Sequence, residues 1–406
     1  MLFERKGNFA LMSEALINST QETNNKELEL VITCISLEPF KEKRIDQILE
    51  NTLDWSKFIQ IANQQGVLPI CCQQIINLTD HRIPSGTIDN CNEIIKANHK
   101  KNLRLAWKLV ECVNLLEINR IEHVVLKGSI FALQAYNNLS LRQFSDLDIL
   151  IHPKDFPKVY DLMDASGYIP KLKLGKKQKK FQVLSDNQYP FNQQGDTFEI
   201  HWDVAPRENI DPWLSEQMWK EKCTVQILDK RIATLSLENT ILFICLHGAK
   251  HGWKQLKWIV DLAYYYQLFP ENSWPALLEY AKKNGLTRQV CLGLLLAEDL
   301  VGLTIPANIH ALISKDAHAQ ELAAKVSAAL FGGATQSSLI NDYLFYGSTR
   351  ERRRDRVRYF IELVFVPKNP DWNTLQLPEC LYFLYYLFRP IRLIYLAGKL
   401  LFTKSP

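Results

Sequence analysis

The pattern of apolar and polar residues predicts a small β-sheet in the middle of the chain. Three short runs have the character of strands, and they cover residues 124–126, 144–151 and 197–204. In the third run apolar and polar side chains alternate, as in a strand with one buried face. Glu199, His201 and Asp203 therefore share one face of that strand. We expect a helix over 130–136 between the first two strands.

Helical spacing of apolar residues dominates the chain before and after these strands. Residues 26–37, 54–65 and 98–119 predict helices, with Asp54 as an N-cap and Gly66 as a stop. From Ser236 to the end the pattern is helical again. The first 25 residues are polar and mixed, and we expect them to be loose.

These elements predict an α+β protein whose core is a small mixed sheet with helices on one side. We expect a helical N-terminal region (1–105), a catalytic core (106–235) and a helical C-terminal domain (236–406). The two helical parts would form the walls of a cleft over the sheet.

Composition and charge narrow the classes of protein only slightly. A hydrophobic fraction of 47% is ordinary for a globular chain, and a net charge of +4 does not by itself require nucleic acid or an anionic membrane. The nine cysteines form no C-x-x-C pair, and the first residues lack an apolar signal core, which favours a reduced, cytoplasmic protein. No Walker-type loop or G-x-S-x-G occurs, which disfavours P-loop kinases and α/β-hydrolases.

The candidate chemistry lies between the first two strands. Asp146 and Asp148 are two apart on a strand, so their carboxylates point to the same face and can share a divalent metal. Gly128 and Ser129 form a tight turn that opens the following helix. A helix N-terminus offers free N–H groups to phosphate, so the two features together indicate a nucleotide-handling centre.

The order G-S, helix, D-L-D resembles the signature of the polymerase-beta-type nucleotidyltransferase superfamily. More narrowly, L-K-G followed by Y, R and S-D-L-D-I-L-I is similar to a bacterial branch of uncharacterised nucleotidyltransferases, and the similarity extends from about Asp54 onward. It implies a third carboxylate on a neighbouring strand, which is Glu199, with Asp203 as the rival position. His201 would hold an acid or a backbone carbonyl in place.

The resemblance implies Mg²⁺-dependent transfer of a nucleoside monophosphate from an NTP to an unidentified acceptor, with release of pyrophosphate. The acceptor could be a small molecule, a natural-product peptide, a sugar or a protein. Two ions would be held by the three carboxylates, and four further residues would contact the nucleotide. The metal ligands and catalytic residues are Asp146, Asp148 and Glu199, and the nucleotide-binding residues are Lys127, Gly128, Ser129 and Arg142. The alternatives are a non-catalytic NTP-binding regulatory module and a toxin-like enzyme that acts on RNA or a partner protein.

Four stretches permit two interpretations each. The lysine-rich residues 171–180 predict a solvated hairpin or loop, or a basic flap over triphosphate; the arginine-rich residues 350–358 predict a solvated face or a nucleic-acid contact. His247 and His251 predict packing of the helical domain or a metal pair. The apolar run 381–388 is shorter than the ~20 residues of a membrane span. We therefore expect no transmembrane segment, but a C-terminal helix that is buried or contacts a partner or a membrane surface.

Overall fold

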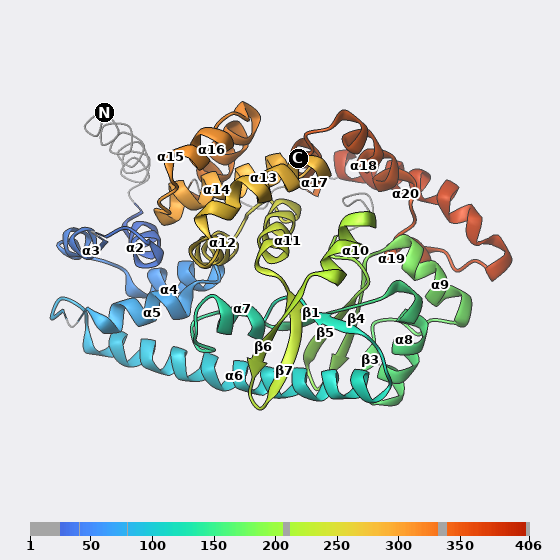
Figure 1. Ribbon diagram of the computed structural model, residues 1–406, viewed down its shortest axis with the longest axis horizontal. Helices are drawn as coiled ribbons and strands as arrows, with labels where there is room; N and C mark the ends of the chain where they lie inside the picture. The colour runs from blue at the N-terminus through green and yellow to red at the C-terminus, as the bar shows by residue number, and fades with distance from the viewer. Residues whose placement is uncertain (1–24, 40, 79, 206–211, 332–338, 403–406) are drawn as a thin grey trace.

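The computed structural model describes residues 25–39, 41–78, 80–205, 212–331 and 339–402, and it is an α+β protein (Figure 1). A single mixed sheet lies at its centre, with helices before and after it in the sequence. The prediction of a loose N-terminal segment concerns residues that lie, except for residue 25, outside this description.

The sheet has seven strands in the order β3-β4-β5-β2-β1-β7-β6. Its strands are β1 (His123–Val125), β2 (Asp146–Ile151), β3 (Ile169–Pro170), β4 (Gln188–Gln193), β5 (Asp196–His201), β6 (Lys222–Ile227) and β7 (Lys230–Leu235). The three predicted strands are β1, β2 and β5, which occupy three neighbouring central positions. β1 runs antiparallel to β2, and β2 runs parallel to β5. The sheet is larger than predicted, because β3, β4, β6 and β7 extend it on both sides.

Five described helices precede the first strand of the sheet in the sequence. They are α2 (Lys26–Ile35), α3 (Lys41–Leu49), α4 (Trp55–Gln64), α5 (Leu68–Asn77) and α6 (Ser85–Ile118). Asp54 caps α4 as predicted, since its Oδ1 accepts a hydrogen bond from the Lys57 N–H at 3.0 Å. The long helix α6 runs beside the sheet (Figure 1) and begins earlier than predicted. It crosses the expected boundary after residue 105 without a break, and the division into three regions stays a prediction.

The helices within the core are short. They are α7 (Ser129–Gln134), η1 (Pro153–Asp155), α8 (Phe156–Ala165), α9 (Lys176–Ser185) and α10 (Pro212–Lys220). The reading of residues 171–180 as a hairpin or loop is wrong for their second half, which forms the first turns of α9. The Gly175 N–H donates to Oε1 of Gln178 at 2.7 Å, so a capping interaction starts this helix despite its crowded lysines.

Helices make up the chain after β7, as predicted. They are α11 (Leu237–Lys250), α12 (Leu256–Leu268), η3 (Glu271–Ser273), α13 (Trp274–Asn284), α14 (Thr287–Val301), α15 (Ala307–Ile313), α16 (Ala317–Phe331), α17 (Leu339–Ser348), α18 (Arg353–Phe365), α19 (Asn369–Thr374), η4 (Glu379–Leu384) and α20 (Tyr385–Phe402). One continuous hydrophobic cluster runs from α2 through the sheet to α16. The sheet and the helices α11 and α12 therefore form one packed unit. Among the described helices, none combines the length and apolarity needed to cross a bilayer.

Candidate active site

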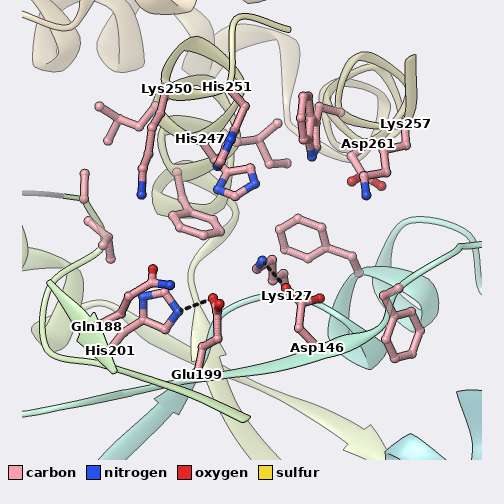
Figure 2. Close-up of a pocket in the computed structure, with 18 of the residues that line it drawn as sticks. Lys127, Asp146, Gln188, Glu199, His201, His247, Lys250, His251, Lys257 and Asp261 are labelled. Atoms are coloured by element: carbon pink, nitrogen blue, oxygen red, sulfur yellow. Dashed lines mark hydrogen bonds and ion pairs between the residues drawn. The ribbon is translucent and has the colours of Figure 1, made fainter. Parts of the chain in front are cut away.

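A cavity of about 280 Å³ lies between the sheet and the helices α11 and α12 (Figure 2). Its floor carries Asp146 from β2 and Glu199 and His201 from β5. Its roof carries basic and aromatic side chains from α11 and α12, and these are His247, Lys250, His251, Lys257 and Trp258. The floor acids, with Lys127 beside them, thus face the lysines and histidines of the roof, which also includes Asp261.

Strand register brings the predicted acids together. β2 and β5 are parallel neighbours in which Asp148 pairs with Glu199. Side chains of directly paired residues lie on the same face of a sheet, so these two carboxylates are adjacent. Asp203 lies beyond the end of β5, and its Oδ1 accepts a hydrogen bond from the Val204 N–H at 2.8 Å. The geometry therefore favours Glu199 over Asp203 as the third acid.

Lys127 is the counter-ion of the acid pair. Its Nζ lies 3.0 Å from Oδ2 of Asp146 and 3.1 Å from Oδ1 of Asp148. Burial lowers the pKa of Lys127, but the two carboxylates outweigh burial and raise it above its usual value. Burial raises the pKa of Asp146, yet the charge of Lys127 lowers it overall to about 2. Sequence reasoning assigned Lys127 to the nucleotide and missed this ion pair.

His201 holds two acids in place, in line with the expectation for it. Its Nε2 lies 3.0 Å from Oδ1 of Asp148 and 3.6 Å from Oε2 of Glu199. Burial lowers the pKa of His201, but the hydrogen bonds to Asp148 and Glu199 raise it overall. Burial raises the pKa of Asp148, whereas the hydrogen bond from His201 lowers that of Glu199 against the effect of burial. Glu199 is therefore the more readily ionised of the two carboxyls.

The same three side chains fit a divalent cation. One ligand atom each from Asp148, Glu199 and His201 lies within 4.8 Å of the others. Asp148 is fully buried, and its Oδ2 has no hydrogen-bond partner among the described residues. A buried carboxylate oxygen without a partner is costly, and a metal ion would satisfy it. Carboxylate oxygens suit Mg²⁺, and the imidazole nitrogen also suits softer transition metals.

The predicted phosphate turn lies beside the cavity rather than in its lining. Gly128 has φ +69° and ψ −120°, a conformation that glycine adopts readily, and it precedes α7. Ser129 is fully buried, and its Oγ has no partner among the described residues. Neither residue belongs to the cavity wall. Their contact with phosphate stays a prediction.

Arg142 reaches the cavity wall, but its guanidinium faces an acid of α12. Its Nε and Nη2 donate to the two carboxylate oxygens of Asp261 at 2.9 and 2.8 Å, and Tyr136 Oη donates to the same carboxylate at 2.7 Å. Both partners of the ion pair are buried. The arrangement fastens α12 to the loop before β2, and a nucleotide contact by Arg142 stays a prediction.

The roof contains two histidines that pack on each other. The ring centroids of His247 and His251 lie 4.6 Å apart, and His251 stacks on Trp258 at 5.3 Å. Burial lowers the pKa of His247 well below its usual value, and it also lowers the pKa of Lys250 and of Lys257. Packing against the site, rather than zinc binding, is the alternative that this geometry favours.

Lys250 is a cavity residue that sequence reasoning missed. It follows His247 by three positions on α11, so both lie on the same helix face. This spacing was the signal in the sequence that could have identified Lys250 as a cavity residue. Lys257 of α12 also lines the cavity, whereas Lys254 pairs with Asp342 at 2.6 Å.

Residues 51–302 match a protein-family model described as "Uncharacterised nucleotidyltransferase". The chain belongs to this family. The matched segment includes the acids of β2 and β5 and the helices α11 and α12, so it covers both the floor and the roof of the cavity.

Two solved structures are similar to parts of the chain. The antibiotic-resistance factor ANT(2'')-Ia is 9% identical, and the match covers 43% of this chain and 90% of that one at a TM-score of 0.31. An antigenic nucleotidyltransferase-like protein from Paracoccidioides brasiliensis is 16% identical, with 44% and 77% covered at a TM-score of 0.27. Neither TM-score is high enough to establish a shared fold. No curated protein matches the sequence.

Proposed function

We propose that this nucleotidyltransferase-family protein transfers a nucleoside monophosphate from an NTP to an acceptor, with Mg²⁺ and with release of pyrophosphate. The observation that carries the proposal is the pairing of the buried Asp148 with Glu199 on adjacent strands. Glu199 and Asp146 line the floor of the cavity, and Asp148 lies outside that lining. In this proposal Asp146, Asp148 and Glu199 are the catalytic and metal-binding residues. The nucleotide-binding residues are Lys127, Gly128, Ser129 and Arg142.

A divalent cation held by the three carboxylates would neutralise charge on the phosphate oxygens. Glu199 has a lowered pKa and is ionised at neutral pH, so it can accept the proton of an acceptor hydroxyl. His201 holds Asp148 and Glu199 in the orientation that both tasks require. Lys127 lowers the pKa of Asp146 and offsets part of the burial that raises the pKa of Asp148. A nearby positive charge of this kind favours the ionised form of adjacent carboxyls.

The basic roof suits the triphosphate of an NTP. Burial lowers the pKa of Lys250 and of Lys257, and the structure gives neither ammonium group an ion pair within the described residues. Both lysines are half-buried, and Lys257 Nζ lies over the Trp258 ring. Removing a cation from water without an ion pair is costly, and a polyanion in the cavity would compensate both lysines. The roof and floor together would hold the triphosphate between lysines and metal-binding acids.

The test is transfer of label from NTPs that are labelled at the α-phosphorus. Each of ATP, GTP, CTP and UTP is incubated with the protein, Mg²⁺ and a cell lysate, and the labelled products are separated into small molecules, peptides, RNA and proteins. We expect transfer by the wild type, none by Asp148→Ala and undiminished transfer by Asp203→Asn, a matched control that removes a nearby carboxylate outside the cluster.

The rival function is a regulatory module that binds NTP without catalysis. Tight NTP binding with no labelled product in any fraction would favour the module and refute transfer. Label in the RNA or protein fraction would identify a toxin-like enzyme within the same reaction class. Label in a small molecule or peptide would identify a biosynthetic one.

A further inference from the structure

The C-terminal helix α20 lies on the protein with its cationic face inward and its apolar face outward. Arg389 is buried, and its Nη1 donates to Oδ2 of the fully buried Asp371 at 2.8 Å. Arg392 pairs with the other oxygen of that carboxylate. Arg389 also donates to the carbonyl oxygen of Leu363 on α18, at 3.0 Å from Nε and 2.8 Å from Nη2. An ordinary surface helix has the opposite orientation, with charges in water.

This anchoring leaves a stripe of large apolar side chains in solvent. Leu387, Ile391, Ile394 and Tyr395 follow one another at i, i+4, i+7 and i+8, and their exposed fractions are 62%, 66%, 74% and 68%. A second exposed stripe, formed by Val357, Ile361 and Phe365, lies on α18, against which α20 packs. Contiguous exposed apolar surface of this kind marks an interaction site.

A lysine-rich helix adjoins the apolar stripe. Phe181 of α9 makes ring contacts with Trp372, Tyr382 and Tyr386 of the C-terminal segment. Lys177 precedes Phe181 by one turn and is exposed, and so are Lys176 and Lys180. Figure 1 shows α9, α19 and α20 together at one end of the molecule.

The sequence segments that contain α9 and α20 are rich in basic residues. Residues 171–185 and residues 380–406 contain lysines and arginines but no aspartate or glutamate. Acids of α8 pair with Lys173 and Lys179, whereas Lys176 and Lys180 of α9 are exposed beside the apolar surface. This combination of aliphatic and aromatic side chains with basic ones is typical of helices that lie in the interface of an anionic bilayer.

We propose that this end of the molecule binds the surface of a membrane that contains anionic lipids. The apolar stripe of α20 enters the boundary between head groups and acyl chains, and the lysines of α9 contact the anionic head groups. The ion pairs of Asp371 hold α20 against the protein body in the orientation that this binding requires. The surface is separate from the cavity and does not depend on the proposed transferase activity.

The test is co-sedimentation of the full chain with vesicles of phosphatidylcholine alone and with about 30 mol % phosphatidylserine. We expect binding to the anionic vesicles that weakens as salt is added, and little binding to the neutral ones. Ile391→Asp and Ile394→Asp, tested separately, should each abolish binding. Both side chains are mostly in solvent, so circular dichroism and thermal melting should show a fold like that of the wild type.

Two variants measure the electrostatic contribution to membrane binding: the lysine triple, in which three lysines of α9 are replaced, and a matched control, in which three lysines elsewhere are replaced. Lys176→Gln, Lys177→Gln and Lys180→Gln together should weaken partitioning by about 100-fold, since each lysine near an anionic surface contributes about five-fold. Lys43→Gln, Lys96→Gln and Lys100→Gln remove three exposed lysines elsewhere and should leave partitioning unchanged.

Three results would overturn the proposal. They are no sedimentation with either vesicle, equal sedimentation of the lysine triple and its control, and a dimer in sedimentation velocity that Ile391→Asp dissociates. The last would show that a second copy of the chain covers the stripe.

Discussion

Removing the buried carboxylate of Asp261 should destabilise the protein strongly. Asp261 accepts two hydrogen bonds from Arg142 and one from Tyr136, and the carboxylate and the guanidinium are both almost fully buried. Breaking a buried ion pair by removing one partner costs about 3–5 kcal/mol, because the other charge stays buried and unpaired. Asp261→Leu should therefore lower the free energy of unfolding by about that amount.

The double variant Arg142→Met/Asp261→Leu removes both charges and should recover most of the loss, since apolar replacement of a buried ion pair is often neutral. Recovery should fall short by about 1–3 kcal/mol, because the Tyr136 hydroxyl loses its acceptor. Adding Tyr136→Phe should restore the remainder.

Urea unfolding followed by circular dichroism measures these differences. The matched control is Asp342→Leu, which breaks the more exposed pair with Lys254 and should cost about 0–1 kcal/mol. Equal losses for Asp261→Leu and Asp342→Leu would refute the claim that the buried pair fastens α12 to the core. NTP binding by the stable triple variant then tests Arg142 itself: lost binding supports its predicted nucleotide contact, and retained binding contradicts it.

Three further predictions concern the turn, the roof and the titration of the histidines. Gly128→Ala should cost about 1–3 kcal/mol in urea unfolding, because alanine is strained at φ +69° and ψ −120°; Gly86→Ala, whose added methyl group meets nothing within 4 Å, should cost nothing. Equal effects would contradict the strain argument. Lys250→Met and Lys257→Met should each weaken NTP binding by about 10-fold or more in calorimetry, as expected for a lost charge-assisted hydrogen bond; Lys254→Met, which removes a lysine outside the cavity, should not. Because burial lowers the pKa of His247, the folded protein loses stability as the pH falls below the usual pKa of histidine. Because the acids raise the pKa of His201, the charged form of this residue stabilises the folded protein, and that contribution is lost as the pH rises above the usual value. On acidification from about pH 7 to about pH 5, the melting temperature of His247→Gln should therefore fall less than that of the wild type, and that of His201→Gln should fall more. Shifts in the same direction for both variants would contradict these assignments.

Local patterns were enough to find the central strands and the acid pair. Alternation with period two placed Asp146 and Asp148 on one face, and the structure adds the parallel pairing with β5 that brings Glu199 beside Asp148. The helical pattern predicted after Ser236 is confirmed by the helices from α11 to α20. In these segments local propensity and tertiary packing favour the same conformation.

The outer strands could not be found from sequence because their patterns are weak. β4 has Pro190 between its two buried aromatic side chains and polar residues on either side of them, which resembles a loop. The turn between β6 and β7 places Leu228 at φ +54° where glycine is the usual signal. The ion-pair partner of Arg142 could also not be predicted from local patterns, since Arg142 and Asp261 are 119 residues apart in sequence.

The most direct measurement of the central claim is Mn²⁺ binding in the presence of an NTP, followed by the electron paramagnetic resonance signal of free Mn²⁺. Mn²⁺ replaces Mg²⁺ at carboxylate sites and gives a signal that binding removes. The account predicts that the wild type and Asp203→Asn bind Mn²⁺, and that Asp148→Asn and Glu199→Gln bind it much more weakly. Wild-type affinity in Glu199→Gln, or a loss in Asp203→Asn as large as in Asp148→Asn, would contradict the proposed site.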